Sequence, residues 1–373
     1  MSGTEVSLWK HFDWMMLATT LLISFFGLLM IYSTTSEPGP FVPNSFVIRQ
    51  AIYLVVGLLM MGVLASVDYR FLSNWTWVIY VLTLGLLAAI FVIGHSTYGS
   101  TRWINLGPVP VQPSELAKLS MVLVLARFLS VKPRGQSSLY RFAVSLALIG
   151  APFALVFVQP DLGTSLVLLA IWLSVTLLSG ARWKHFLWLA ALSLPVGIVA
   201  WEFLLQPYQR QRVLVFLDPE SSALGAGYNI IQARISIGAG GLTGQGYLTG
   251  TQSQLNYLRV QHSDFIASVI GEEFGFLGLL ALLVVYGLLL WRMIRVAQLA
   301  RDTYGELIAA GVATIYLFQI FVNMGMNMQL MPVTGIPLPL VSSGGSSLVT
   351  LLAAQGVLQS ILMRHKKLNT QLL

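Results

Sequence analysis

The sequence contains no cysteine and very little charge. Only 9% of its 373 residues are Asp, Glu, Lys or Arg, whereas 56% are hydrophobic, and the mean hydropathy is +0.77. The lack of cysteine excludes disulfides and thiolate metal sites, and a soluble domain of this size could not hide so much apolar surface. The composition therefore predicts an integral membrane protein whose helices are held together by packing and by polar contacts between them.

Ten apolar stretches are long enough to cross a bilayer as helices. They cover residues 14–33, 48–66, 75–94, 114–131, 141–159, 163–179, 184–205, 266–291, 305–327 and 345–363. We therefore expect an all-α, polytopic membrane protein of about ten transmembrane helices. The first stretch is too long for a cleaved signal peptide, which favours a retained anchor. With no repeat of fixed period, a single membrane domain over residues 1–373 is the simplest partition.

The distribution of basic residues predicts the orientation, because short cytoplasmic loops are rich in Lys and Arg. On the side of the two termini these residues are Lys10, Arg70, Lys132, Arg134, Arg141, Arg182, Lys184, Arg292, Arg295, Arg301, Arg364, Lys366 and Lys367. The opposite short loops carry only Arg49 and Arg102. Both termini are therefore predicted to be cytoplasmic. Anionic lipid headgroups account for the net charge of +7, so no nucleic-acid partner is needed.

One connection, residues 206–263, is too long for a simple connector between spans seven and eight, and it lies on the outer side. Its mixture of aromatic, aliphatic and charged residues argues against disorder, and Ile230, Ile231, Ile235 and Ile237 suggest a short amphipathic piece. Its glycines lack the setting of a P-loop or a dinucleotide site. We expect most of them to form flexible turns: Gly238, Gly240, Gly241, Gly244, Gly246 and Gly250.

Two acidic positions lie within or next to spans, where an ionisable group needs a partner or a purpose. Glu115 and Lys118 are three residues apart on one helix face, so they form an ion pair that either orders the bundle or contacts substrate. Ser114 is a candidate cap for their helix. Asp161 stands where span six begins, and capping that helix is its simplest role.

Asp264 is the acidic residue best placed for chemistry, because it ends the long outer loop and opens span eight. In the segment His262-Ser263-Asp264 the carboxylate meets both water and the membrane boundary, where a general base could act. A helix cap is the competing interpretation. Glu272 and Glu273, two turns deeper, are expected to adjust the pKa of Asp264 or to pair with an arginine.

Several further polar residues are predicted near the same outer face. Arginines that converge on one cavity would bind a pyrophosphate or carboxylate, whereas isolated ones would contact lipid headgroups. The candidates are Arg49, Arg102, Arg210 and Arg212, and Asp161, His262 and Ser263 are further candidates for substrate binding. In the last third of the chain, Asn323 and Asn327 share a helix face, and residues 337–347 break the chain before the last span. Such polar backbone at membrane depth lines a cavity or packs closely.

Four segments together resemble the SEDS family (shape, elongation, division and sporulation), and within it the elongation, RodA type. They are TRWINLGPVPVQPSELAK, VQPDLGTS, the long stretch from YQRQRVLVFLDPES through GTQSQL to HSDFIASVIGEEFG, and GIPLPLVSSGGSS. The resemblance covers nearly the whole chain. It implies a ten-helix peptidoglycan glycosyltransferase of the bacterial cytoplasmic membrane that polymerises lipid II during elongation and maintenance of cell shape. The implied partners are a class B penicillin-binding protein, which crosslinks the strands, and other membrane proteins of the elongation complex.

The resemblance also implies roles for individual residues. Asp264 matches the acid of the long outer loop that is essential for polymerisation, Glu115 and Lys118 match an intramembrane pair, and Asp161 matches the acid of the QPDLGTS motif. In the implied reaction Asp264 accepts the proton of an attacking sugar hydroxyl, and arginines stabilise the departing polyprenyl pyrophosphate. A divalent cation, Mg²⁺ or Mn²⁺, could share that task, although the sequence holds no dedicated ligand cluster.

Two other functions stay open at this stage. A transporter or flippase would use the polar residues to move lipid II or another amphiphile by alternating access. A non-catalytic scaffold would only position a penicillin-binding protein, and Asp264 would then merely cap a helix. The outer clustering of polar residues favours the enzyme, because a carrier needs comparable polar access from both sides.

Overall fold

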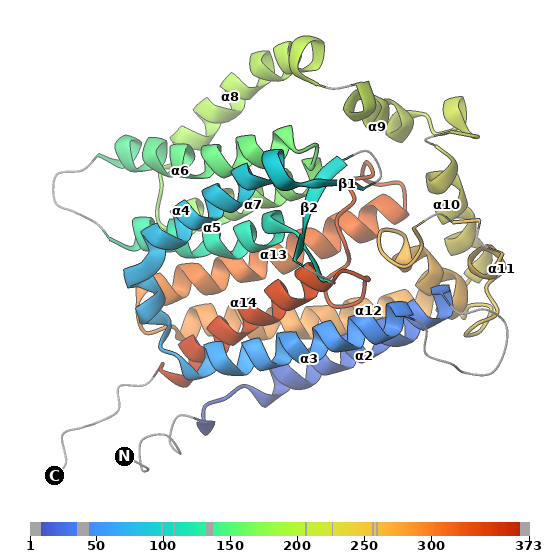
Figure 1. The fold of residues 1–373 in the computed structure, drawn as a ribbon, viewed down its shortest axis with the longest axis horizontal. Helices are drawn as coiled ribbons and strands as arrows, with labels where there is room; N and C mark the ends of the chain where they lie inside the picture. Colours follow the sequence, from blue (N-terminus) through green and yellow to red (C-terminus); the bar gives the residue numbers. More distant parts are fainter. Residues whose placement is uncertain are drawn as a thin grey trace.

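Long helices, roughly aligned, form one bundle in the computed structural model of the protein (Figure 1). The structure describes residues 9–35, 45–97, 100–106, 109–131, 137–205, 207–225, 227–255, 257–258 and 260–365. Lys132, Arg134, Lys366 and Lys367, which entered the count of basic residues, lie outside these ranges. The first and last described residues lie together, since the rings of His11 and His365 are 5.1 Å apart. The helices of the long loop lie at the opposite end of the bundle (Figure 1).

Each of the ten apolar stretches forms a helix. These are α2 (Trp14–Thr35), α3 (Ser45–Ser66), α4 (Tyr69–Ile93), α5 (Pro113–Ser130), α6 (Ser138–Val158), α7 (Leu162–Leu178), α8 (Trp183–Val199), α12 (Ile266–Leu299), α13 (Thr303–Asn327) and α14 (Gly345–Met363). Within the described residues, eight of these helices are long and apolar enough to cross a membrane and are the candidate spans, and α7 is a shorter apolar helix. The remaining helix, α5, carries three charged residues. Together these helices confirm the expected polytopic helical membrane protein.

Two helices extend well beyond the apolar runs that predicted them. α4 begins at Tyr69 rather than at residue 75, because the Asp68 side chain caps it by accepting a hydrogen bond from the Arg70 amide at 2.9 Å. α12 continues to Leu299 rather than ending at 291, and its last turns carry Arg292 and Arg295. Apolar length therefore marks the part of a helix that the bilayer covers, and polar residues extend the helix past it.

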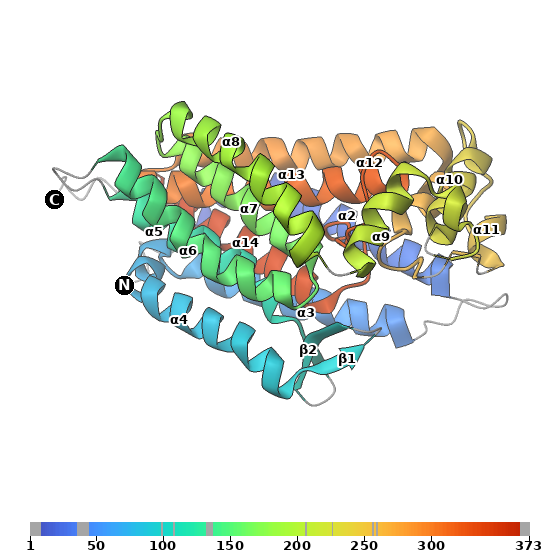
Figure 2. The ribbon, with the colours of Figure 1, turned by 90° about the horizontal axis from the view of Figure 1, so that it is seen from above.

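The centre of the bundle is formed by α13 and α14. In α14, 89% of the 18-residue stretch that could span a membrane is buried inside the protein, although the mean hydropathy is only 1.5. In the α8 span, just 6% of the corresponding stretch is buried. Figure 2 shows α14 among the other helices and α8 at the periphery. α14 packs mainly on α3, where a Cβ on Gly356 would lie 2.6 Å from the carbonyl oxygen of Met61. Small residues thus allow the two backbones to approach closely.

Buried amides join α14 to its neighbours. Gln355 donates to the Tyr316 hydroxyl of α13 at 2.8 Å and accepts from Thr20 Oγ1 of α2 at 2.7 Å. One turn later, Gln359 exchanges hydrogen bonds with the backbone of Asp13 in both directions, at 2.9 and 3.0 Å. These bonds explain why α14, the most buried of the eight candidate spans, is also the least apolar of them, since each amide in the interior needs a partner.

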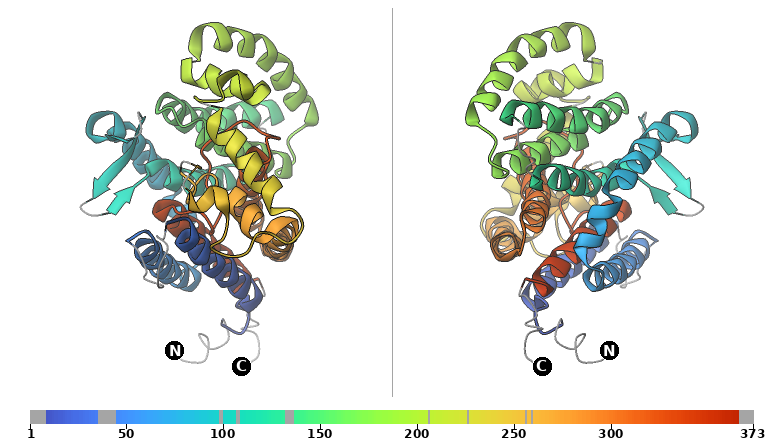
Figure 3. Two further views of the ribbon diagram at one scale, coloured as in Figure 1. Left: turned by 90° about the vertical axis from the view of Figure 1, so that its right-hand side faces the viewer. Right: turned by 90° about the vertical axis from the view of Figure 1, so that its left-hand side faces the viewer.

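A small antiparallel sheet between α4 and α5 was not predicted from the sequence. Its strands β1 (His95–Thr97), β2 (Ser100–Leu106) and β3 (Val109–Val111) pair in the order β1-β2-β3, with Ile104 opposite Val111. Figure 3 shows the sheet standing out from the side of the bundle. The strands are too short to give a clear alternating pattern, and β3 contains a proline, Pro110. The sheet fixes the position of Arg102 on β2.

The long outer loop is mostly ordered into short helices. These are α9 (Pro207–Leu217), the 3₁₀ turn η2 (Glu220–Ser222), α10 (Tyr228–Gly240) and α11 (Thr251–Gln254). The expected amphipathic piece corresponds to α10, with Ile230 buried and Ile235 exposed. α10 packs against α12, and there is no room for a Cβ between Gly240 and the carbonyl of Gly271. The interpretation of the glycines as flexible surface turns was therefore wrong for Gly240, and also for Gly244.

Gly244 belongs to a turn that inserts where α12 is broken. Gly275 interrupts α12 with φ 66° and ψ −164°, a conformation that only glycine adopts readily. The amides freed by the break donate to the turn instead: Phe276 N lies 2.9 Å from Gly241 O, and Leu277 N lies 3.0 Å from Leu242 O. In return, Gln245 N donates to Glu272 O at 2.9 Å. Both parts of α12 are thus attached to the loop by backbone bonds.

Replacing Gly275 with alanine is expected to destabilise the protein by roughly 1–3 kcal/mol, because alanine would be strained at this φ and ψ. Its Cβ would also collide with the backbone of Gly244 and Leu242. Gly287→Ala in the same helix is the matched control, since nothing lies within 4 Å of its Cβ position. Thermal unfolding of the detergent-solubilised protein checks this. Equal melting temperatures for the two variants would contradict the strain at Gly275.

Candidate functional site

Asp264 lies immediately before α12, at the end of the bundle that carries the long-loop helices (Figure 1). Its side chain is partly exposed, and Oδ1 accepts a hydrogen bond from Ser263 Oγ at 2.9 Å. Its backbone carbonyl accepts from Asn323 Nδ2 at 3.2 Å and from Asn327 Nδ2 at 3.0 Å. The two asparagines on one face of α13 thus hold the main chain of Asp264 and leave its carboxylate directed elsewhere.

The segment between α13 and α14, residues 328–344, holds the other side of the same turn. Ser342 Oγ donates to the carbonyl of Ser263 at 2.6 Å, and the amide of Ser343 donates to the carbonyl of His262 at 2.9 Å. The broken chain predicted there therefore packs closely against residues 262–264. Gln50 of α3 fixes this segment in turn, because its Nε2 donates to Ser342 O at 3.2 Å.

The sequence reasoning missed Gln50, although a signal for it was present. Gln50 is an amide in the apolar run of α3 and is only 4% exposed. A polar group at such a position must find hydrogen bonds inside the protein. Gln50 follows directly after Arg49, which is exposed on α3 and was the residue singled out instead.

The environment of Asp264 favours a carboxylate that can take up a proton. Burial raises the pKa of Asp264, and this effect outweighs the lowering by the Ser263 hydrogen bond and by the charges of Arg212, His262 and Arg102. Burial also lowers the pKa of His262, although the nearby Asp264 opposes this. The His262 ring lies 4.9 Å from the Phe46 ring, centroid to centroid. A carboxylate with a raised pKa beside basic groups suits general acid–base chemistry.

Arg102 connects Asp264 to the acid at the start of α7. Arg102 Nη1 lies 3.7 Å from Asp161 Oδ1, and its guanidinium also donates to the carbonyl oxygens of Gln159 and Pro160. Asp161 caps α7 by accepting from the Thr164 amide at 3.2 Å. Asp161 therefore caps α7, as the simplest interpretation of the sequence predicted. It also forms an ion pair with Arg102.

Ser114 binds Asp161 rather than capping α5. Its Oγ donates to Asp161 Oδ2 at 3.2 Å, and the N-cap position of α5 belongs to Gln112. Gln112 Nε2 donates to the same carboxylate oxygen at 3.1 Å. The prediction of a Ser114 cap was wrong, because proline occupies the first turn of α5 and leaves the serine side chain directed at the neighbouring helix.

The two arginines of α9 have different surroundings. Arg212 Nη1 donates to Val333 O at 3.2 Å, within the segment that supports Asp264, and its charge acts on that carboxylate. Arg210 instead donates through Nη2 to Glu202 O at 2.8 Å, in the π-helical turn η1 (Ala200–Leu204). Of the four candidate arginines, the structure thus brings Arg102 and Arg212 to Asp264.

Glu115 and Lys118 form the expected ion pair. Lys118 Nζ lies 2.7 Å from Glu115 Oε2, and the two side chains are only 1% and 4% exposed. They lie on α5, whose first turn is joined to Asp161 by Ser114. The pair is too deeply buried to meet a ligand in this conformation, so its position fits the ordering of the helix bundle.

Glu272 and Glu273 do not act on Asp264 as expected. Glu272 is buried and accepts hydrogen bonds from the amides of Gln252 at 2.7 Å and Ser253 at 3.2 Å, which fixes the start of α11. Glu273 accepts a hydrogen bond from Ser33 Oγ of α2. The charges that shift the pKa of Asp264 come from the outer loop and β2 instead. The prediction was wrong because both carboxylates lie about two helical turns from Asp264 and are occupied by other donors, Glu272 by the start of α11 and Glu273 by Ser33.

Among the described residues, no three His, Asp or Glu side chains come close enough to hold a metal ion. Asp161 is already engaged by Arg102 and by the donors of Gln112, Ser114 and Thr164. Asp264 would therefore be a single protein ligand, and these residues do not fit a dedicated divalent-cation site. We derive no step through a metal.

Breaking the buried ion pair should destabilise the protein strongly. Glu115→Gln would leave Lys118 without its partner in the interior, which typically costs about 3–5 kcal/mol. Replacing Lys118 with Met in the same variant should recover much of that loss, because no buried charge is then left. Thermal unfolding of the single and double variants measures this. A double variant no more stable than Glu115→Gln would contradict the importance of the unpaired charge.

The comparison with known proteins agrees with this architecture. Residues 13–367 match the family model FTSW_RODA_SPOVE, described as cell cycle protein. The peptidoglycan glycosyltransferase MrdB of Escherichia coli K12 is 41% identical over 359 residues, covering 96% of this chain and 95% of MrdB.

Two solved structures share the fold. A chain from a peptidoglycan synthase complex superposes with a TM-score of 0.82 at 34% identity, covering 95% of this chain and 98% of that chain. The rod shape determining protein RodA of Thermus thermophilus gives a TM-score of 0.70 at 30% identity, covering 94% and 96% of the two chains. The matched region includes α2 to α14 with the Asp264 site, and the chain therefore belongs to the FtsW/RodA/SpoVE family, the SEDS family.

Proposed function

We propose that this protein is a peptidoglycan glycosyltransferase of the elongation type that polymerises lipid II, with Asp264 as the general base. The observation that carries the proposal is the geometry of Asp264, a partly exposed carboxylate with a raised pKa that lies within the influence of Arg212 and Arg102. The 41% identity to the glycosyltransferase MrdB over nearly the full length supports the activity.

The proposed reaction is a single displacement. A sugar hydroxyl of one lipid-linked disaccharide attacks the anomeric carbon at the reducing end of another chain. Asp264 takes the hydroxyl proton as the new C–O bond forms, and the bond to the polyprenyl pyrophosphate breaks with its electron pair leaving on the phosphate oxygen. One base and one displacement invert an α linkage to a β linkage without a covalent intermediate, as in inverting sugar hydrolysis.

Arg212 and Arg102 are the proposed stabilisers of the departing pyrophosphate. Both guanidinium groups act on Asp264 electrostatically, and both are held by backbone carbonyls, Arg212 by Val333 and Arg102 by Gln159 and Pro160. Fixed cations at the place where negative charge develops lower the barrier most effectively. Arg49 and Arg210 would have to move to share this role, so we assign them to headgroup or loop contacts.

We further propose that the protein lies in the bacterial cytoplasmic membrane with both termini in the cytoplasm and Asp264 on the outer face. The excess of Lys and Arg at the terminal end of the bundle supports this orientation. We propose a class B penicillin-binding protein as partner, with other membrane proteins of the elongation complex. The likeness to a chain of a peptidoglycan synthase complex that coordinates polymerisation with crosslinking supports a synthase partner.

Asp264→Asn should abolish polymerisation while the protein stays folded. Removing a general base typically lowers the rate by about 10²–10⁴-fold. The assay incubates purified protein and partner with labelled lipid II and resolves the glycan products by size. Asp218→Asn is the matched control, because Asp218 is an exposed aspartate of the same outer loop, and it should polymerise like the wild type.

Polymer from Asp264→Asn at the rate of wild type would remove Asp264 as the base. If the wild-type protein moved lipid II across vesicle membranes and made no polymer, the transporter would be favoured. If it made no polymer but increased the crosslinking activity of the partner, the scaffold would be favoured.

The pH dependence of kcat/KM should reveal the influence of Arg212. Activity is expected to fall as pH decreases through the pKa of Asp264, because the base becomes protonated. Since the Arg212 charge lowers that pKa, Arg212→Gln should move the acidic limb of the profile to higher pH. Arg210→Gln is the matched control on the same helix and should leave the limb in place. An unchanged limb in Arg212→Gln would contradict the influence of the Arg212 charge on the pKa of Asp264.

A further inference from the structure

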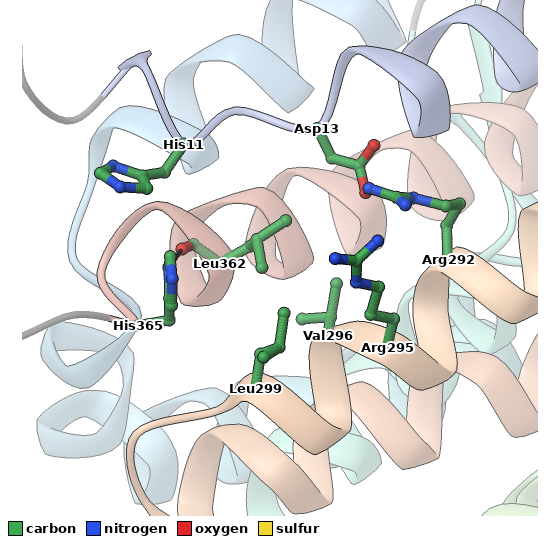
Figure 4. A pocket seen from close by; sticks show the side chains of 8 residues that line it. All are labelled: His11, Asp13, Arg292, Arg295, Val296, Leu299, Leu362 and His365. Atoms are coloured by element: carbon green, nitrogen blue, oxygen red, sulfur yellow. Dashed lines mark hydrogen bonds and ion pairs between the residues drawn. The ribbon is translucent and has the colours of Figure 1, made fainter.

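A second polar site lies at the other end of the bundle, far from Asp264. It is a pocket of about 170 Å³ between the start of α2, the end of α12 and the end of α14. Five titratable side chains and three aliphatic ones line it: His11, Asp13, Arg292, Arg295, Val296, Leu299, Leu362 and His365. Figure 4 shows the two guanidinium groups reaching from α12 toward the Asp13 carboxylate.

The pocket holds more positive than negative charge. Asp13 is the only acidic residue among the described ones that line it, and Arg292 binds one oxygen of that carboxylate, with Nη2 at 2.7 Å and Nε at 2.8 Å from Oδ2. The other oxygen of Asp13 accepts from the Met16 amide at 2.9 Å. Arg295, one turn after Arg292, adds a second guanidinium that the single carboxylate cannot neutralise. A guanidinium beside another guanidinium gains most from a bound anion, which it can contact through several N–H groups.

The frame of the pocket is fixed before any ligand binds. Gln359 holds the backbone of Asp13 through two hydrogen bonds, and the Asp13 side chain is nearly inaccessible. His365 closes one side, with Nδ1 2.6 Å from Leu362 O and its ring 5.1 Å from that of His11. The volume is well above the ~10–15 Å³ that one water requires. A preformed site of this kind avoids much of the ordering entropy of binding.

The surroundings of the pocket indicate that the anion belongs to a lipid. Exposed tryptophans mark the same end of the bundle, with Trp14 beginning α2 and Trp291 preceding Arg292, at 64% and 51% exposure. Tryptophan gathers at the level of lipid headgroups. Val296, Leu299 and Leu362 give the pocket an apolar wall, which a free inorganic anion would not use but the glycerol and acyl chains of a phospholipid would.

We propose that this pocket binds the phosphodiester headgroup of an anionic phospholipid, with Arg295 as the main contact and Arg292 as a second donor. The lipid phosphate would supply the negative charge that Asp13 alone does not. Binding there would join the first and last spanning helices, α2 and α14, to the end of α12. This inference does not depend on the glycosyltransferase activity.

The test measures binding of short-chain phosphatidylglycerol to the full-length protein in a neutral detergent, by native mass spectrometry, with phosphatidylcholine as the neutral lipid. The wild type should prefer phosphatidylglycerol. Arg295→Gln should weaken that binding about fivefold, the change expected when one basic residue is lost at an anionic surface. Arg295→Lys should keep most of it. Arg301→Gln is the matched control, an exposed arginine just beyond α12 and outside the pocket, and should bind like the wild type.

Equal weakening in Arg295→Gln and Arg301→Gln would overturn the proposal, since the effect would then reflect general surface charge. Displacement of the lipid by inorganic phosphate at the same concentration would also overturn it, by identifying a site for free anions. Because Arg295 is exposed, its variants are expected to change binding and not folding.

Discussion

The site depends on the hydrogen bonding of a chain segment that is not helical inside a helical membrane protein. Residues 328–344 leave the helix after α13, and their polar groups are paired with side chains and with the turn at 262–264. Ser342, Ser343 and Gln50 make these bonds on one side, and Asn323 and Asn327 hold Asp264 from the other. In an apolar surrounding each unpaired backbone group would be costly. Satisfying the segment therefore also fixes the position of Asp264.

The electrostatic properties of Asp264 follow from that arrangement. The turn buries the carboxylate enough to raise its pKa, while its amide neighbours bind the main chain rather than the side chain. The carboxylate accepts a hydrogen bond from Ser263, and further donors to it would have stabilised the charged form and made a weaker base. Asp161 illustrates the alternative, because it accepts bonds from several donors and pairs with Arg102, and so serves to organise the start of α7.

Sequence predicted the helices well because apolar length is a strong and local signal, and it located Asp264 because that residue marks the boundary of a span. It could not distinguish Arg210 from Arg212. Residues two apart on an α-helix point to nearly opposite faces, and the rotation of α9 relative to Asp264 is decided by tertiary contacts. The sheet of β1, β2 and β3 was missed for a related reason, since its short strands pair only with one another and are separated in the sequence by Gly99, Gly107 and Pro108. Glu272 and Glu273 looked alike in sequence, yet one fixes α11 and the other meets α2.

The interruption of α12 at Gly275 divides that helix into two mechanical parts. The part from Ile266 to Phe274 accepts backbone hydrogen bonds from Gln245 and Gly246, and the part that continues to Leu299 donates through Phe276 and Leu277 to Gly241 and Leu242. The turn of the long loop thus bridges the two parts and replaces the helical hydrogen bonds that are lost at Gly275. A rearrangement of residues 241–246 would therefore act on both parts of α12 at once, whereas α3 reaches residues 342–344 independently of that turn, through Gln50.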